Sequence, residues 1–199
     1  MLNLLLPGTA KDYRNYRWFI TSNGNFVVGG KSDEQNEIVI KNFLRPEYIV
    51  MHTSEPGSPF CILLNEKPMK KDLDETAVFC GCFSQQWKKI SGSGKISIDI
   101  FKGEQIYKVK GMKLGTFGVK GEKKIIKIKP ELFVVMQKGK IRAVPSGTKE
   151  KILAKIVPGK LTKEDASGKI AKIIRDKYDF PVSKEEIMQA IPSGNLNVK

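Results

Sequence analysis

Cysteine, histidine and long apolar runs are all scarce in this chain of 199 residues. Its three cysteines, an odd number, argue against a disulfide framework and are typical of a reducing compartment. No apolar run approaches the roughly 18 to 20 residues that a membrane-spanning helix needs. The apolar start at residues 1–8 has no basic flank and no small-residue cleavage site, so we interpret it as a first strand or packing arm. We therefore expect a cytoplasmic protein without a membrane partner.

The single histidine, His52, follows an apolar run and precedes a polar turn at residues 55–59. No spacing specifies a Ser–His–acid set, so we expect a structural or ligand-contacting histidine and not a catalytic base. Together with Cys61, Cys80 and Cys82 it could supply four zinc ligands in number. However, Cys80 and Cys82 lie two residues apart in a predicted helix and point about 200° away from each other. We expect buried apolar thiols, with neither a metal nor a cofactor.

Acidic residues are few compared with basic ones, and the imbalance is local. The chain has 35 Lys+Arg against 21 Asp+Glu, a net charge of +14. Residues 1–90 carry 11 basic and 10 acidic residues, whereas residues 102–142 alone carry 12 basic and 3 acidic ones. A local excess of this size favours a polyanionic partner. A solubility charge, or lysine enrichment typical of a hot environment, is the alternative that stays open.

The spacing of apolar residues predicts an α+β fold: a mixed or antiparallel sheet with two principal helices, followed by a small helical C-terminal extension. Residues 16–20 and 26–29 alternate as a hairpin around Asn23-Gly24. Ser32 or Asp33 opens the first helix. Asp72 or Asp74 opens the second.

From residue 95 the apolar period changes to two, which predicts strands with short turns. These expected strands are 96–100, 106–110, 123–129, 132–136 and 140–144. Beyond Pro145-Ser146-Gly147 the pattern becomes helical, beginning with a segment that carries Ile152, Leu153 and Ile156. We therefore divide the chain into a domain at residues 1–145 and a helical extension at residues 146–199.

Lysines follow the β-rich segment closely. Alternation would place two lysines on one face of the first of two neighbouring strands and three, including Lys123, on one face of the next; two more lie in the glycine-rich connection between these strands. We expect six lysines of this stretch to hold phosphates: Lys108, Lys110, Lys113, Lys120, Lys127 and Lys129. The alternative is the solvated outer face of an antiparallel sheet.

A second anion site is predicted at residues 29–33, Gly-Gly-Lys-Ser-Asp, which precede a helix. Backbone amides at a helix N-terminus and the Lys31 ammonium attract one phosphate. Because the Walker spacing is missing, we expect a backbone phosphate and not a nucleotide triphosphate. A simple turn into a capped helix would explain the same residues, and this alternative stays open.

Several motifs together resemble one known family. Residues 16–24 are Tyr-Arg-Trp-Phe-Ile-Thr-Ser-Asn-Gly, followed by Val-Gly-Gly-Lys at 28–31, Gln-Asn-Glu at 35–37, Val-Met-His-Thr at 50–53 and Pro-Gly-Ser at 56–58. In order and spacing they closely resemble the NFACT-R domain. That domain is the C-terminal RNA-binding domain of the NFACT ribosome quality-control factors, once grouped with fibronectin-binding protein A. The resemblance covers roughly residues 10–145, and includes the basic stretch at 108–119.

The resemblance implies RNA binding without catalysis, with tRNA or ribosomal RNA as the target and the large ribosomal subunit as a possible partner. Carried over by position, the polar site residues are Arg17, Lys31, Asn36, Glu37 and His52. Glu37 is acceptor-only when ionised, so we expect it to bond a backbone amide, a lysine or a 2′-hydroxyl. The chain lacks the other modules of full-length NFACT proteins. We therefore expect a free-standing NFACT-R protein to which nascent-chain tailing does not transfer.

Two other function classes remain. The same cluster could be the active site of an RNA-processing or RNA-modifying enzyme, with His52 and Glu37 as acid and base. Alternatively, residues 146–199, which the resemblance does not reach, could dock a protein partner as an adaptor.

Overall fold

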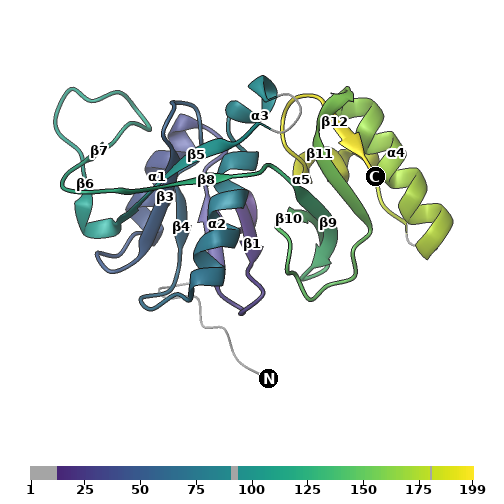
Figure 1. The fold of residues 1–199 in the computed structure, drawn as a ribbon, viewed down its shortest axis with the longest axis horizontal. Helices are drawn as coiled ribbons and strands as arrows, with labels where there is room; N and C mark the ends of the chain where they lie inside the picture. The colour runs from purple at the N-terminus through teal and green to yellow at the C-terminus, as the bar shows by residue number, and fades with distance from the viewer. Residues whose placement is uncertain (1–12, 91–93, 180) are drawn as a thin grey trace.

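The computed structural model describes residues 13–90, 94–179 and 181–199, and the arm expected at residues 1–8 lies outside this part (Figure 1). One half of the molecule is a six-stranded antiparallel sheet with the order β1-β2-β4-β3-β5-β8. Its strands are β1 (Arg17–Ile20), β2 (Phe26–Gly29), β3 (Ile49–Thr53), β4 (Cys61–Leu63), β5 (Ile96–Lys102) and β8 (Lys124–Ile128). The expected α+β class with an antiparallel sheet is confirmed.

Two helices cover opposite faces of this sheet. α1 (Asp33–Phe43) begins after Ser32, whose side chain accepts a hydrogen bond from a backbone N–H of the first turn, as the sequence predicted. Its apolar side packs on one sheet face together with Trp18 and Val28. α2 (Lys70–Cys82) packs on the other face, and a short helix, α3 (Gln86–Lys89), follows it. The central strands β2, β3 and β4 therefore alternate between two separate apolar layers.

α2 starts at Lys70, two residues earlier than the sequence suggested, because Asp72 acts inside the helix. Its carboxylate accepts from the backbone N–H of Met69 and from the Thr21 hydroxyl, at 3.0 and 2.6 Å. One turn later, Glu75 accepts from the backbone N–H of Ser22 at 2.8 Å. These buried acids bind the β1–β2 turn and so fix the position of β1.

The three cysteines lie in the layer between α2 and the sheet. Cys61, Cys80 and Cys82 are all buried and free. Burial raises the pKa of the Cys61 and Cys82 thiols, because the thiolate is poorly solvated there. The expectation of buried apolar thiols is confirmed.

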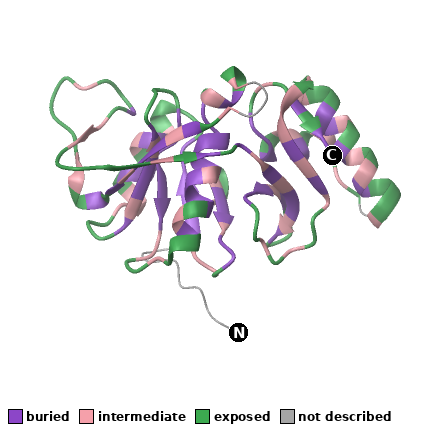
Figure 2. Ribbon diagram, viewed as in Figure 1, coloured by how far each residue is buried: buried purple, intermediate pink, exposed green. Residues whose placement is uncertain are grey.

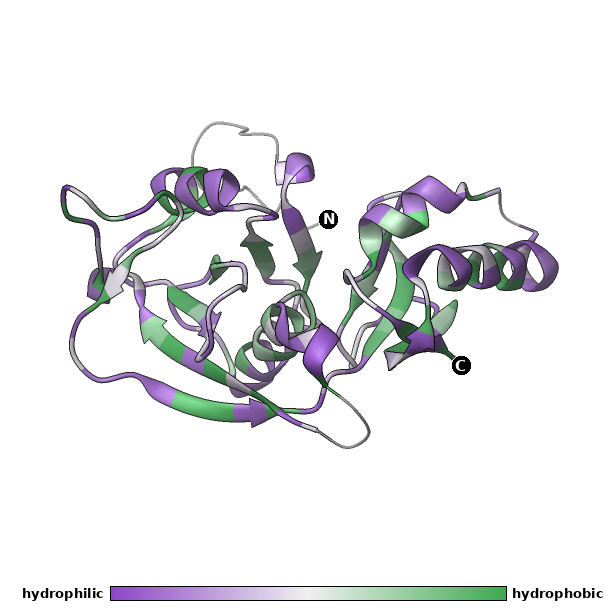
Figure 3. Cartoon of the chain, turned by 90° about the horizontal axis from the view of Figure 1, so that it is seen from above, coloured by the Kyte–Doolittle hydropathy of each residue, from purple (hydrophilic) through white to green (hydrophobic). Residues whose placement is uncertain are grey.

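The other half of the molecule is a four-stranded antiparallel sheet with the order β10-β9-β11-β12. Its elements are β9 (Leu132–Gln137), β10 (Lys140–Val144), β11 (Ala154–Leu161), β12 (Leu196–Val198), α4 (Lys163–Tyr178) and α5 (Lys184–Ala190). We call residues 132–199 the second unit. Seen from above, α4 is hydrophilic over much of its surface (Figure 3). None of the helices in the described part of the chain has the length and apolar content to cross a bilayer.

The expectation of a purely helical segment after residue 145 is wrong. β11 occupies residues expected to be helical, and it pairs with β9 on one side and β12 on the other. Strands from both sides of residue 145 therefore belong to one sheet. Farther along, the helical pattern is present as α4 and α5, which are capped by the side chains of Thr162 and Ser183.

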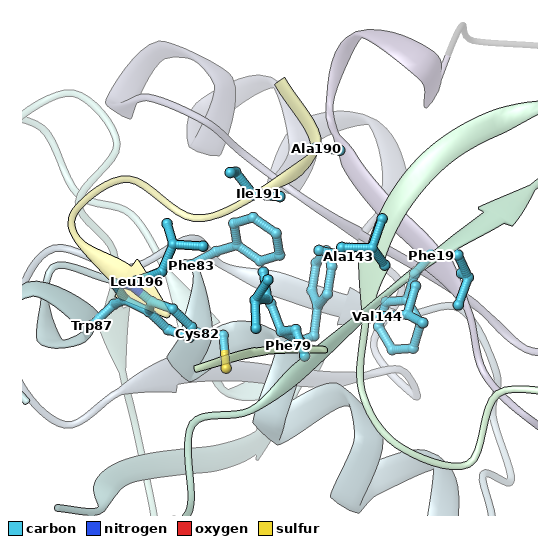
Figure 4. Close-up of a cluster of buried hydrophobic side chains, with 14 of the residues drawn as sticks. Phe19, Phe79, Cys82, Phe83, Trp87, Ala143, Val144, Ala190, Ile191 and Leu196 are labelled. Atoms are coloured by element: carbon cyan, nitrogen blue, oxygen red, sulfur yellow. The ribbon is translucent and has the colours of Figure 1, made fainter. Parts of the chain in front are cut away.

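The two halves share one apolar core. Phe79, Phe83 and Trp87 from the α2–α3 region pack among side chains of the second unit, including Val144 and Ile191 (Figure 4). Polar contacts also cross the boundary. The Gln137 side chain accepts from the backbone N–H of Ile20 and donates to its carbonyl, both at 2.9 Å. Trp87 Nε1 donates to the Asn195 carbonyl at 3.1 Å.

A long loop between β5 and β8 lies at the end of the molecule opposite α4 (Figure 1). It contains the two-residue strands β6 (Ile106–Tyr107) and β7 (Gly118–Val119), which pair with each other. Most of the loop is exposed (Figure 2). The strand expected at residues 106–110 is thus only two residues long, so Lys108 and Lys110 do not share a strand face. Residues 108–117 instead form an irregular connection.

Candidate nucleic-acid interface

A cavity of about 460 Å³, here the first cleft, opens between α1, the β3–β4 loop, β5 and the loop at 115–119. Three phenylalanines line it: Phe60, Phe101 and Phe117. Polar side chains line it as well: Asn36, His52, Ser54, Ser58 and Asp99. The Phe117 ring stands edge-on to Phe60, with the ring centroids 5.3 Å apart. This arrangement combines aromatic surface with hydrogen-bonding groups.

His52 has a defined tautomer in this cleft. Its Nδ1 lies 2.7 Å from the Thr53 carbonyl oxygen, which can only accept, so Nδ1 carries the proton. Burial lowers the His52 pKa below its ordinary value, and the hydrogen bond with the Thr53 carbonyl and the charge of Asp99 oppose this effect. The neutral ring, 4.6 Å from the Phe60 ring, therefore has Nε2 as an acceptor.

Glu37 and Lys108 fasten the long loop to α1. The Glu37 carboxylate accepts from Lys108 Nζ at 2.5 Å and from the backbone N–H of Gly115 at 2.9 Å. The hydrogen bond from Lys108 lowers the pKa of Glu37. Lys108 Nζ also donates to the Lys113 carbonyl and lies 4.7 Å from the Phe117 ring centroid. Both side chains therefore hold the loop that carries Gly115 and Phe117, which line the first cleft.

Asn36 is buried between two loops. Its Oδ1 accepts from the backbone N–H of Phe60 at 3.2 Å. A Cβ on Gly30 would lie 2.4 Å from that Oδ1 and 2.6 Å from the backbone nitrogen of Asn36. Gly30 is thus needed for this close approach, and Asn36 positions the loops on which the neighbouring site residues stand.

A second cleft of about 370 Å³ adjoins the first, and Asn36, Gly57 and Ser58 line both. Arg17 and Lys31 contribute cations to it, beside the N-terminus of α1. The Arg17 guanidinium lies 4.5 Å from the Phe83 ring centroid, and burial lowers its pKa to about 10. Burial also lowers the pKa of Lys31, and Arg17 and Arg142 lower it further.

A known protein family matches the part of the chain that forms the first cleft. The pattern described as NFACT protein RNA binding domain matches residues 15–121, which include both loops of the first cleft. The chain belongs to this NFACT RNA-binding family. The family resemblance seen in the sequence is therefore confirmed.

Two relatives match parts of this chain. The chain is 29% identical over 200 residues to "Archaeal Rqc2 homolog aRqcH" of Methanocaldococcus jannaschii, covering 94% of this chain and 29% of that protein. It is 31% identical over 78 residues to "Ribosome quality control complex subunit NEMF" of Homo sapiens, covering 38% of this chain and 7% of NEMF. The chain thus spans less than a third of the length of these relatives. The archaeal match extends beyond the NFACT RNA-binding domain, so the second unit has a counterpart there.

A solved structure shares the fold. The C-terminal part of the fibronectin/fibrinogen-binding protein from Streptococcus suis matches with a TM-score of 0.52 and 16% identity. The match covers 62% of this chain and 49% of that one. At this identity the likeness shows the fold alone.

The predicted site residues of the NFACT domain fall into three groups. Arg17 and Lys31 line the second cleft, and Asn36 and His52 line the first. Glu37 and Lys108 bond to each other. The remaining lysines are exposed on the long loop and on or after β8: Lys110, Lys113, Lys120, Lys127 and Lys129. Their expected role in RNA binding stays a prediction.

Sequence reasoning missed two contributors. Phe60 and Phe117 form the aromatic walls of the first cleft, yet alternation in the sequence did not show which aromatic residues line a cavity. Arg142 approaches Arg17 and Lys31 from the second unit, more than one hundred residues away along the chain. No local pattern could have indicated this neighbour.

Proposed function

We propose that this chain is a non-catalytic RNA-binding protein that contacts tRNA or ribosomal RNA in ribosome-associated quality control in the cytoplasm. The observation that carries the proposal is the position of two adjoining clefts, one aromatic and one cationic, inside the NFACT RNA-binding domain. Proteins bind unpaired RNA by stacking bases on aromatic rings and holding the backbone with cations. The named relatives, which are ribosome quality-control proteins by their descriptions, support the same pathway.

The exposed lysines support an electrostatic contribution beside the clefts. Lys110, Lys113, Lys120, Lys127 and Lys129 form no ion pair within the described residues. By contrast, Lys123 is paired with Asp99 at 2.5 Å, and Lys108 is paired with Glu37. The unpaired lysines are free to neutralise backbone phosphates, and in this proposal they supply affinity while the clefts supply selectivity.

The test measures binding of fluorescein-labelled tRNA by fluorescence anisotropy at several salt concentrations. Reversing three loop charges with Lys110→Glu, Lys113→Glu and Lys120→Glu should weaken binding by at least about tenfold and reduce the salt slope by about 2. The matched control is Lys160→Glu, Lys172→Glu and Lys177→Glu, which changes three exposed lysines of the second unit. Equal losses in both variants, or no preference for tRNA over heparin, would contradict the proposal.

The enzyme alternative requires Glu37 to act together with His52, and the position of Glu37 does not support this. The Glu37 carboxylate bonds to Lys108 and Gly115, and among the described residues it does not line the first cleft with His52. His52→Gln should therefore change RNA affinity, and no catalytic turnover should be lost in this variant.

The adaptor alternative assumed a helical extension, but residues 146–199 also contain β11 and β12, and β11 pairs with β9. Deleting them would expose a sheet edge as well as remove a docking surface.

A further inference from the structure

Three cations meet where the NFACT domain touches the second unit. Arg17 comes from β1, Lys31 from the loop before α1, and Arg142 from β10; all three line one crevice between the two halves. Arg17, Lys31 and Phe83 also line the second cleft, so the crevice opens off that cleft. We call these three side chains the seam cations.

In the described part of the chain the seam cations have few counter-charges: burial lowers the pKa of Arg142, and Glu186 opposes this effect. None of them forms an ion pair there, and no carboxylate lines the crevice. Asp33 and Glu34 line the second cleft but not the crevice. Three like charges held close together repel one another: burial is the main cause of the lowered pKa of Lys31, and Arg17 and Arg142 lower it further.

The two guanidinium groups also have unused donors. The Nε atoms of Arg17 and Arg142 are both shielded from solvent and donate to no acceptor among the described residues. Buried donors are nearly always bonded in folded proteins, and an unbonded charged donor is especially unfavourable. Two such donors in one crevice therefore indicate an acceptor that is not part of the polypeptide.

Aromatic rings hold both guanidinium planes in place. Arg17 lies 4.5 Å from the Phe83 ring centroid, and Arg142 lies 4.1 Å from the Trp18 ring centroid. The in-plane N–H groups of a guanidinium beside a ring point away from that ring, and two of them match two oxygens of a phosphate or carboxylate. The crevice itself has a volume of only about 10 Å³, so a phosphate would sit in the second cleft and reach the crevice with one oxygen.

We propose that the seam cations bind one phosphate group of the RNA that occupies the adjoining clefts, and that the second unit, through Arg142, completes this phosphate site. The inference rests on the proposed RNA-binding function. It adds that residues outside the matched NFACT domain contact the RNA. A free phosphate ion has the same chemistry, so the experiment separates these two sources.

The first measurement follows the arginine Nε–H signals of the full chain by NMR. Arg17→Lys and Arg142→Lys assign the two signals and keep the charge. Titration with unfractionated tRNA should shift both signals with one common saturation, while the signal of Arg175, exposed on α4, should stay in place. A parallel titration with inorganic phosphate reports the free ion. Two seam signals that move with neither tRNA nor phosphate overturn the site.

The second measurement compares tRNA affinity in charge-matched variants. Arg142→Gln should weaken binding about tenfold, whereas Arg175→Gln, which loses the same charge on an exposed helix surface, should change it less than about twofold. Thermal unfolding of each variant confirms that it is folded, and Arg142→Lys should recover only part of the affinity because lysine lacks the bidentate edge.

The outcomes separate the two proposals. If tRNA binds but Arg142→Gln and Arg175→Gln behave alike, the phosphate site on RNA is overturned and the RNA-binding function stands. If tRNA does not bind while phosphate shifts both seam signals, the RNA-binding function fails, and with it the RNA source of the phosphate. Selective loss in Arg142→Gln together with shifts of both signals supports the full inference.

Discussion

Replacing Arg17 by methionine should stabilise the fold while weakening RNA binding. Burial lowers the pKa of Arg17 from its ordinary value to about 10. This difference corresponds to about 3 kcal/mol against the charged form in the folded state at neutral pH. Methionine keeps an apolar stem over Phe83 but carries no charge. It forfeits about 1 kcal/mol of cation–π attraction and about 1 kcal/mol of packing.

The balance favours the Arg17→Met variant by about 1 kcal/mol in the absence of an anion. For a chain of this size, that is an increase in Tm of about 2 to 4 °C. Because the folded-state pKa is the lower one, the penalty is fully present below about pH 10 and fades as the pH rises toward the higher pKa of the unfolded chain. The gain should therefore be constant near neutral pH and shrink above about pH 10.

Differential scanning calorimetry in phosphate-free buffer measures this gain. Arg45→Met is the matched control, because the Arg45 guanidinium lies over Tyr48 with its centroid 5.6 Å away but is exposed. It should change the free energy of unfolding by less than about 1 kcal/mol. A Tm of Arg17→Met below that of the unmodified protein, in phosphate-free buffer, would refute the idea that the charge is uncompensated.

Three further predictions concern the clefts. Gly30→Ala should destabilise by about 2 to 4 kcal/mol in urea unfolding, because the new Cβ would lie 2.4 Å from Asn36 Oδ1. His52 should titrate below 6.5 in an NMR pH series. The free energy of unfolding should fall as the pH drops through this range, because the unfolded chain binds the proton more tightly. His52→Gln should remove this pH-dependent loss of stability. Glu37→Gln should speed amide exchange at Gly115 about tenfold, because a charged acceptor becomes neutral.

Each of these predictions has a contrary outcome. Gly168→Ala is the control for Gly30, because its Cβ meets no atom within 4 Å in the middle of α4, and it should stabilise by up to about 1 kcal/mol. Similar effects in both glycines would contradict the close approach to Asn36. A His52 pKa at or above 6.5 would contradict its burial. Unchanged exchange at Gly115 would show that Glu37 does not hold the loop.

Local signals in the sequence were sufficient where one segment determines its own structure. α1 was predicted from Ser32 or Asp33 as the residue that opens it, and the Ser32 cap is an interaction within one helical turn. The β1–β2 hairpin was predicted from its Asn-Gly turn and alternation for the same reason. Glu37 was expected to bond a lysine or an amide, and it bonds both.

Distant partners determined the segments that were predicted wrongly. Ile152, Leu153 and Ile156 have helical spacing, yet Ile156 lies in β11, whose partners β9 and β12 are remote in the sequence. Short apolar runs of this kind fit either period. Likewise, Lys108 and Lys110 alternate as in a strand, but the bond from Lys108 to Glu37 draws the chain into a loop.

Gln137 has a consequence for the behaviour of fragments of this chain. β1 is an edge of the six-stranded sheet, and the Gln137 amide occupies the N–H and carbonyl of Ile20 as a neighbouring strand would. At the opposite edge, β8 presents exposed Lys124 and Lys127. Open strand edges promote self-association, and lysines or covering groups suppress it. A fragment that ends before β9 would lose Gln137 and keep protecting lysines only at the β8 edge. We therefore expect this fragment to aggregate through its uncovered β1 edge.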